Sequence, residues 1–216
     1  VSKDYESLKS FTENASHEIQ TPLAIIKNKI ELLLQSENFD ETQVNAIQSV
    51  NEAASKLSRL NQSLLLLAKI ENRQFEQAEK INFSDVVHRT AENFEELALI
   101  KNISIEKNIT DPVFIKINDT LAEILASNLI LNAIKHNLPN GNIKINLSVK
   151  SMLVSNTGNE PNENTDHFFE RFKKSSSSRD SIGLGLAIVK TICDTYGFGV
   201  SYSYKSGIHS VKVDFQ

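Results

Sequence analysis

Residues 16–22 read Ser-His-Glu-Ile-Gln-Thr-Pro, and this short stretch determines how the rest of the chain is interpreted. It places His17, Glu18 and Thr21 on one predicted amphipathic helix. His17 and Thr21 are four residues apart, so they lie on the same helical face, one turn from each other. An imidazole becomes a nucleophile once one ring nitrogen is deprotonated and the other is oriented, and an adjacent carboxylate can act as the base. The spacing therefore predicts a nucleophilic His17, with Glu18 as base and Thr21 positioning a water for hydrolysis. The alternative is a surface histidine beside an acid.

Apolar residues recur every three or four positions on both sides of this stretch. They predict a helix from about residue 2 to 35. Pro22 lacks an N–H and crowds the carbonyl of Glu18, so it either kinks this helix or ends it, and the periodicity that resumes after it favours a kink. A polar connection at 36–40 leads to a second helix at about 41–75. One hairpin is too thin to bury both apolar stripes, so we expect a homodimer with a four-helix bundle.

The chain is interpreted as two domains, at 1–75 and 83–216, joined by a polar linker at 76–82. Helices and strands alternate in the second domain, which predicts an α/β fold with a mixed sheet and helices on one face. The predicted elements are helix 84–100, strands 103–109 and 113–117, helix 119–137, strands 142–149 and 152–156, helix 183–196, and strands 199–205 and 208–215. Residues 157–181 are polar, Ser-rich and aperiodic, and such long loops are often lids.

Composition excludes several classes of protein. The net charge of −4 argues against a nucleic-acid partner, because such proteins are usually basic. The single cysteine, Cys193, rules out a disulfide framework within the chain and lies in an apolar stretch, which favours a core position. No apolar run approaches the roughly 20 residues of a membrane span, and no signal peptide is visible. The chain begins at Val1 within a helical pattern, so we expect a fragment of a longer protein.

A second group of residues predicts a nucleotide site. Asn128 and Asn132 are four apart and share one helical face. Gly183 and Gly185 precede a predicted helix, where glycines let backbone N–H groups approach phosphates and the helix N terminus favours negative charge. A nucleotide site and a nucleophilic histidine in one chain suggest phosphoryl transfer to histidine.

Residues 11–23, FTENASHEIQTPL, resemble the phosphoacceptor box of two-component sensor histidine kinases. The resemblance implies that His17 receives the phosphoryl group, that Glu18 is the base and that Thr21 supports phosphatase activity. Gln20 stands where the family usually has Arg or Lys, and we expect this to change the local charge rather than the nucleophile.

Residues 128–136, NLILNAIKH, resemble the asparagine box of the same family. The resemblance implies that the amide oxygen of Asn132 is a ligand of Mg²⁺, a cation that keeps few protein ligands when phosphates are present. It also implies that Lys135 and His136 contact phosphates. Gyrase-type ATPases of the same superfamily have a glutamate base at the position of Asn128, so this residue disfavours a gyrase-like ATPase.

Residues 155–158, Ser-Asn-Thr-Gly, resemble the first glycine box, with two departures. Asn156 replaces the aspartate that accepts a hydrogen bond from the adenine amino group, and Glu160 replaces the second glycine. An Asn side chain still offers a carbonyl acceptor but lacks the strength of a charged one. The resemblance thus implies base recognition by Asn156 and Gly158 with reduced affinity. Without the other boxes, a plain turn after a strand would be the interpretation.

Two further segments match the family. Residues 168–174, FFERFKK, resemble the phenylalanine box, with Lys174 where an arginine often reaches the terminal phosphate and residues 175–178 as a lid. A simple amphipathic turn is the alternative. Residues 183–190, GLGLAIVK, resemble the second glycine box, which implies nucleotide contacts for Gly183, Leu184, Gly185 and Leu186. Ser181 occupies a position that is often glycine.

The resemblance implies the cytoplasmic part of an inner-membrane sensor histidine kinase, attached to the membrane only through an N-terminal region outside this sequence. It implies ATP and Mg²⁺ as cofactors, autophosphorylation of His17, transfer to an aspartate of a response-regulator receiver domain, and a reverse phosphatase activity. One alternative is a degenerate sensor that dimerises and binds nucleotide or regulator without phosphoryl transfer, and it is favoured by Asn156, Glu160 and Ser181. The other alternative is a phosphatase-dominant protein with weak kinase activity.

Overall fold

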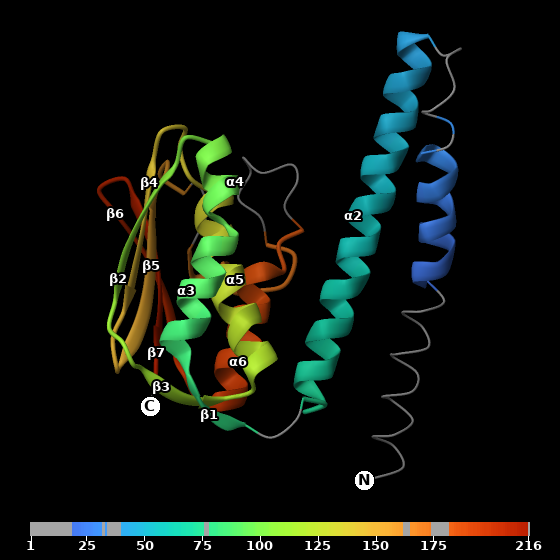
Figure 1. Cartoon of the computed structure of the whole chain (residues 1–216). Helices are drawn as coiled ribbons and strands as arrows, with labels where there is room; N and C mark the ends of the chain where they lie inside the picture. The colour runs from blue at the N-terminus through green and yellow to red at the C-terminus, as the bar shows by residue number, and fades with distance from the viewer. Residues whose placement is uncertain are drawn as a thin grey trace, which may run out of the picture. The chain divides into compact units, whose positions relative to one another are not determined.

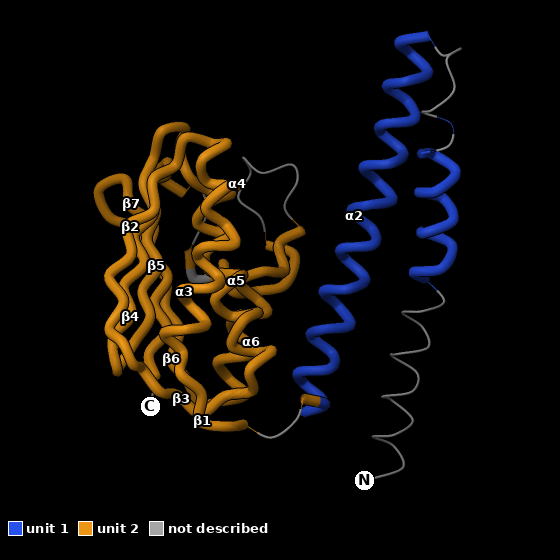
Figure 2. Tube along the Cα trace, in the orientation of Figure 1, with its two compact units in different colours: residues 1–74 blue, residues 75–216 orange. Residues whose placement is uncertain are grey.

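The structure is a computed structural model that describes residues 19–31, 33, 40–75, 78–161, 165–173 and 182–215. The chain divides into two compact units, residues 1–74 and residues 75–216 (Figure 2). Three residues of the predicted sites, His17, Glu18 and Lys174, lie outside the described residues. Ser175–Ser178 and Ser181 lie outside them as well.

The first unit contains a helical hairpin, as predicted. Residues 19–31 are helical, and α2 (Glu41–Glu71) runs in the opposite direction (Figure 1). Pro22 lies within the helical residues, so the helix does not end there. Asp40 begins α2 with a capping box: its carboxylate accepts from the Gln43 N–H at 2.8 Å, and the Gln43 side chain accepts from the Asp40 N–H at 3.0 Å.

The hairpin leaves large apolar side chains at its surface. Leu23, Ile30 and Ala54 are buried, but Ile25 is 57 % and Val50 is 52 % exposed. The other large apolar side chains that are exposed among the described residues of this unit are Ile19, Ile26, Leu33 and Leu57. Within the described ranges, no helix is both long and apolar enough to cross a bilayer.

The second unit is built on a mixed five-stranded sheet with the strand order β2-β4-β5-β7-β6. Its strands are β2 (Ser104–Ile109), β4 (Asn142–Leu147), β5 (Ser151–Thr157), β6 (Gly199–Lys205) and β7 (Ile208–Asp214). The β2–β4 pair is parallel and the other pairs are antiparallel. The helices α3 (Phe83–Asn93), α4 (Glu95–Ile100), α5 (Asp119–Lys135) and α6 (Gly185–Tyr196) cover one face of the sheet (Figure 1). This confirms the predicted α/β fold.

Two elements differ from the sequence-based prediction. Residues 79–82, assigned to the linker, form β1 (Glu79–Asn82), which pairs antiparallel with β3 (Phe114–Ile117) in a separate two-stranded sheet. The helix predicted at 84–100 is two helices, because the Phe94 N–H donates to the carbonyl of Ala91, three residues back, and this tight turn interrupts the α-helical pattern. The predicted long irregular segment contains one short 3₁₀ helix, η1 (Thr165–His167).

The sheet face that meets the helices is apolar at one end and polar at the other. Strand pairing aligns its residues in three rows across β4, β5, β7 and β6: Leu147–Met152–Val213–Val200, Ile145–Val154–Val211–Tyr202, and Ile143–Asn156–His209–Tyr204. The strand residues of the first two rows are mostly buried core side chains. The third row places polar side chains where β5 ends, beside the C-terminal end of α5, and this change of chemistry positions the candidate site.

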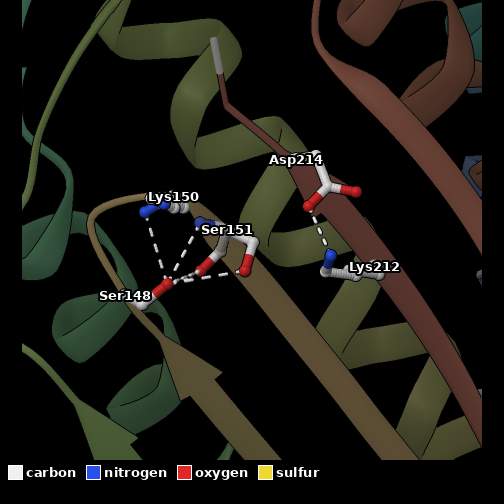
Figure 3. Close-up of polar contacts among 5 residues, drawn as sticks. All are labelled: Ser148, Lys150, Ser151, Lys212 and Asp214. Carbon is white, nitrogen blue, oxygen red and sulfur yellow. Dashed lines mark hydrogen bonds and ion pairs between the residues drawn. The ribbon is translucent and has the colours of Figure 1, made fainter.

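The opposite end of the sheet is closed by polar contacts of its turns (Figure 3). The Ser148 hydroxyl accepts from the backbone N–H groups of Lys150 and Ser151, at 3.3 and 3.2 Å, and so shapes the β4–β5 turn. On β7, Lys212 and Asp214 form an ion pair with 2.5 Å between Nζ and Oδ1. These contacts lie at the sheet end away from Asn156.

Candidate functional site

The asparagine box and the second glycine box meet where α5 packs on α6. A β-carbon at Gly185 would lie 3.2 Å from the Asn128 Oδ1. The Asn128 amide nitrogen donates to the carbonyl of Ile124 at 2.8 Å, and this bond holds the side chain in that orientation. The fold therefore brings together Asn128 and Gly185, which lie more than fifty residues apart in the sequence.

The exposed end of α5 carries the other residues of the asparagine box. Asn132 is half-buried one turn after Asn128, and its carbonyl accepts from the His136 N–H at 3.0 Å. Lys135 is exposed in the last turn. Burial lowers the pKa of His136, and the charges of His209, Lys135 and Lys101 lower it further. The imidazole of His136 is therefore mostly uncharged at neutral pH.

The end of β5 is attached to the end of α5 through Asn156. This side chain is only 5 % exposed, and its Nδ2 donates to the carbonyls of His136 at 3.3 Å and Thr157 at 2.8 Å. Gly158 follows, and a β-carbon there would collide with the imidazole of His209 and lie 3.1 Å from the carbonyl oxygen of His136. The position thus requires glycine for space.

The second glycine box also touches the phenylalanine box. Gly183 has a φ of +75°, and a β-carbon there would collide with the carbonyl oxygen of Lys173. The Phe172 N–H donates to the Gly183 carbonyl at 2.9 Å. Gly183 is therefore required both for its left-handed backbone and for the close approach of the two segments.

The N terminus of α6 is suited to bind an anion. The helix begins at Gly185, and its N-cap residue Leu184 makes no side-chain cap hydrogen bond. The first N–H groups of an α-helix have no hydrogen-bond partner within the helix, so a phosphate can accept hydrogen bonds from them. The helix dipole adds to the attraction. Leu184 is buried and Leu186 is half-buried, so both also anchor this end of the helix.

Three residues that the sequence analysis did not single out, His209, Tyr202 and Tyr204, lie in the same region, together with Phe168 of the phenylalanine box. His209 pairs directly with Asn156 across β5 and β7, and its Nδ1 forms a hydrogen bond with the Tyr202 hydroxyl. The ring of Tyr204 lies 4.9 Å from that of His209, and Phe168 meets Tyr202 edge-on at 4.8 Å, measured between ring centroids. The sequence carried a signal for this cluster. Tyr202 and Tyr204 alternate before the Ser206-Gly207 turn, and that turn sets the register of β6 on β7, which places both tyrosines on one face with His209.

Burial shifts the pKa values of this aromatic cluster. It raises the pKa of Tyr202 to about 12, with a smaller contribution from Tyr204. Burial also lowers the pKa of His209, and a hydrogen bond to the backbone of Asn159 offsets part of this shift. Near pH 7 the Tyr202 hydroxyl is thus protonated and His209 is mostly neutral, so the pair adds hydrogen-bonding groups but no charge beside Asn156.

One further predicted residue that the structure describes, Thr21, belongs to the first unit, where it is exposed on the helical segment. Among the residues that the structure describes, no three His, Cys, Asp or Glu side chains form a group able to hold a metal ion. A cation held mainly by phosphate and water oxygens, with the Asn132 amide as a protein ligand, is compatible with this set of side chains.

Comparison with known families identifies both units. Residues 7–73 match the model of the His Kinase A (phospho-acceptor) domain. Residues 117–214 match the model of the histidine kinase-, DNA gyrase B- and HSP90-like ATPase. Between them, the two models cover the predicted phosphoacceptor box and every motif of the candidate nucleotide site.

Individual relatives align with most of this chain. The heme sensor protein HssS of Staphylococcus epidermidis is 32 % identical over 198 residues, which are 84 % of this chain and 41 % of that protein. The sensor histidine kinase HprS of Escherichia coli is 28 % identical over 211 residues, or 94 % of this chain and 46 % of that protein. The chain thus spans less than half the length of these relatives.

A solved structure supports the fold. The structure of full-length ShkA in complex with AMPPNP superimposes with a TM-score of 0.70, covering 96 % of this chain and 46 % of that one at 21 % identity. At this level of identity the likeness speaks for the fold alone.

Proposed function

Because this chain belongs to the family of two-component sensor histidine kinases, we propose that it transfers the γ-phosphoryl group of Mg-ATP to His17 and then to an aspartate of a response-regulator receiver domain. The observation that carries the proposal is the close approach of Asn128 to Gly185. It brings the polar face of α5 to the N terminus of α6, where the N-cap residue Leu184 makes no side-chain cap hydrogen bond, and this arrangement suits the binding of a polyphosphate.

Each motif has a role in nucleotide binding under this proposal. The second glycine box donates backbone N–H groups to the phosphates and forms the backbone around them, through Gly183, Leu184, Gly185 and Leu186. Lys135, His136 and Lys174 contact phosphates, while Asn156 and Gly158 receive the base. Asn132 supplies an amide oxygen to Mg²⁺, which neutralises phosphate charge when bound. The solved ShkA structure contains AMPPNP, which is consistent with an ATP-binding fold of this kind.

His17 is the proposed phosphoacceptor in the first unit. Its ring nitrogen forms the new N–P bond, the bond from the γ-phosphorus to the bridging oxygen of ADP breaks, and Glu18 takes the ring proton. Thr21 follows His17 by four residues and is exposed on the helical segment, and its proposed role is to orient a water in the reverse phosphatase reaction. Asn128 is an amide that donates to the Ile124 carbonyl and cannot serve as a base for water, which favours transfer over simple ATP hydrolysis.

The first unit is also the proposed dimerisation domain, covering residues 1–75. The exposed apolar side chains of the hairpin, among them Ile25 and Val50, support pairing with a second copy into a four-helix bundle. Residues 83–216 form the proposed catalytic domain, and the connection at 76–82 includes β1. We further propose that the parent protein is an inner-membrane sensor whose membrane segments lie outside this sequence, with this part in the cytoplasm.

The experiment is incubation with γ-labelled ATP and Mg²⁺, followed by acid and base treatment of the labelled protein. An acid-labile, base-stable label that is lost in His17→Gln but kept in the matched control His88→Gln is expected. Label retained in His17→Gln would refute His17 as the acceptor. ATP binding without any label would favour the degenerate or phosphatase-dominant sensor, and dephosphorylation of a phosphorylated regulator would separate those two.

A further inference from the structure

A separate cavity lies in the second unit, at the end of the sheet away from Asn156. Its volume is about 420 Å³, within the range of roughly 300–1,000 Å³ that is typical of small-molecule sites. Its lining includes Phe114 and Lys116 of β3, Val149 of the β4–β5 turn, Tyr196 and Phe198 at the end of α6, and Phe215 after β7. No motif residue that the structure describes is part of this lining, so the proposed function makes no use of the cavity.

One wall of the cavity is aromatic and is rooted in the core. The rings of Phe198 and Phe215 meet edge-on with 5.4 Å between their centroids, and the ring of Tyr196 lies 5.9 Å from that of Phe198. Phe215 in turn packs edge-on at 5.6 Å against Phe83, whose side chain is fully buried. Such a wall favours a flat apolar group, because aromatic rings pack well in offset and edge-on arrangements.

Hydrogen bonds hold the walls in place. The Tyr196 hydroxyl accepts from the Asn118 N–H at 3.1 Å. The Phe215 N–H donates to the Lys150 carbonyl at 2.7 Å, which ties the end of the chain to the β4–β5 turn. The Ser148 hydroxyl shapes the same turn (Figure 3). The cavity is therefore preformed, and a ligand can enter it without first ordering the backbone.

One edge of the cavity is positively charged. Lys116 pairs directly with Lys80 across β3 and β1, so both side chains lie on the face of this small sheet that carries Phe114. The Lys80 Nζ lies 5.0 Å from the centroid of the Phe114 ring. Both lysines are exposed, and neither forms an ion pair with a residue that the structure describes. An anion beside Phe114 would therefore be attracted by both ammonium groups.

The acidic residues near this lining do not offset that charge. Asp194 and Asp214 each adjoin a lining residue in the sequence, and they form ion pairs with Lys190 and Lys212. Glu79 belongs to β1, but it alternates with its neighbour and points to the other face of that strand. Among the described residues, no acid belongs to the lining itself. Apolar surface beside net positive charge is complementary to an apolar molecule that carries a negative charge.

We propose that this cavity binds a small organic anion with a flat apolar body, of the class of aromatic carboxylates. The ring system packs against Phe114, Phe198 and Phe215, and the carboxylate accepts a hydrogen bond from the Lys116 ammonium. Ala78, directly before β1, also lines the cavity, so the ligand contacts the chain where it enters this unit. The inference is independent of the proposed function, because the cavity shares no residue with the nucleotide site.

The test titrates the isotope-labelled whole chain with three probes that share an indole ring and follows the backbone amides by NMR. At neutral pH, indole-3-acetate is negative, indole-3-acetamide is neutral and tryptamine is positive. We expect affinity to fall in that order, with the acetate roughly fivefold tighter than the acetamide. The amide signals of residues 114–116, 149 and 198 should shift, whereas those of Asn132, Asn156 and Gly185 should not.

Substitutions at exposed positions test the lining. Lys116→Met removes the charge and keeps an unbranched side chain, so indole-3-acetate should bind about as weakly as indole-3-acetamide. Val149→Glu, at a side chain that is 66 % exposed, adds a carboxylate beside the cavity and should weaken indole-3-acetate further. The matched control is Lys205→Met, at an exposed lysine of β6 outside the lining, which should keep the wild-type affinity.

Several results would overturn the inference. One is equal affinity for the three probes, and another is a loss in Lys205→Met as large as that in Lys116→Met. Shifts confined to the nucleotide site, or no shifts at the solubility limit of the probes, would also overturn it. Signals of the lining that move on dilution of the free chain would mean that a second copy occupies the cavity instead. If a variant fails to fold, as shown by its thermal melt, the order of the three probes on the wild-type chain still decides.

Discussion

The Asn128 side chain on α5 lies close to Gly185 at the start of α6: its Oδ1 is 3.2 Å from the place where a β-carbon of residue 185 would stand. Position 185 therefore has little room beside the N–H groups proposed to hold phosphates. A methyl group there needs a shift of a few tenths of an ångström, because 3.2 Å is tighter than ordinary van der Waals contact.

Gly185→Ala is therefore expected to weaken ATP binding several-fold while leaving the domain folded. Titration calorimetry with Mg-ATP measures the affinity, and a thermal melt checks the fold. The control is Gly199→Ala on β6, where the added β-carbon would lie 3.5 Å from the Asp214 Cβ, an ordinary contact distance. An unchanged affinity in Gly185→Ala would contradict a tight contact at this position.

Gly183 and Gly207 offer a matched pair of substitutions. Both have left-handed backbones, with φ of +75° and +81°, but a β-carbon at 183 collides with Lys173 whereas one at 207 meets nothing within 4 Å. Each alanine variant is expected to lose about 1 kcal/mol from the backbone. Gly183→Ala should lose more in the free energy of unfolding, measured in urea, and should also lose ATP affinity. Equal losses at the two positions would show that the collision at 183 is relieved at no cost.

Cys193 should be unreactive in the folded protein. Its side chain is fully buried on α6, and burial raises the pKa of the thiol to about 12, so the reactive thiolate is scarce at neutral pH. Labelling with an excess of a thiol reagent at pH 7.5 should be negligible in buffer and complete in denaturing urea. Fast labelling in buffer would mean that α6 opens readily from the sheet.

Acid should destabilise the catalytic unit through His136 and His209. Burial lowers the pKa of both imidazoles from 6.5 in the folded state. As the pH falls below 6.5, the unfolded chain therefore binds protons that the folded chain does not, and the free energy of unfolding falls. Urea unfolding between pH 7.0 and 5.5 measures this decline, which should be shallower in His136→Asn. A stability that rises as the pH falls over this range would contradict the assignment.

Local patterns in the sequence were sufficient to predict most of the elements and motifs. The helix of the asparagine box was predicted at 119–137 and runs over Asp119–Lys135. The helix behind the second glycine box was predicted at 183–196 and begins at Gly185. Both are marked by apolar periodicity, and their start signals, Asn118 and the glycines, lie beside them in the sequence.

Features that depend on distant pairing were not predictable in this way. The four residues of β1 carry no clear alternation, and they are a strand only because β3 lies beside them. His209 reaches Asn156 through the pairing of β7 with β5, two strands separated in sequence by α6 and β6. The orientation of the Asn156 amide depends on the carbonyl of His136, twenty residues away. Such relationships follow from tertiary packing rather than from spacing.

The β5–β7 ladder, residues 151–157 against 208–214, has a consequence for how this protein can evolve. It holds together the two ends of the connection from Gly158 to Gly207, which carries α6 and β6. Since the entropy of closing a flexible loop grows only logarithmically, doubling the length of such a loop costs about 0.6 kcal/mol. Insertions in the segment between β5 and α6 can therefore accumulate at little thermodynamic expense while Asn156 and His209 stay opposite each other. Descendants of this sequence are free to vary that segment without losing the strands that hold these two residues.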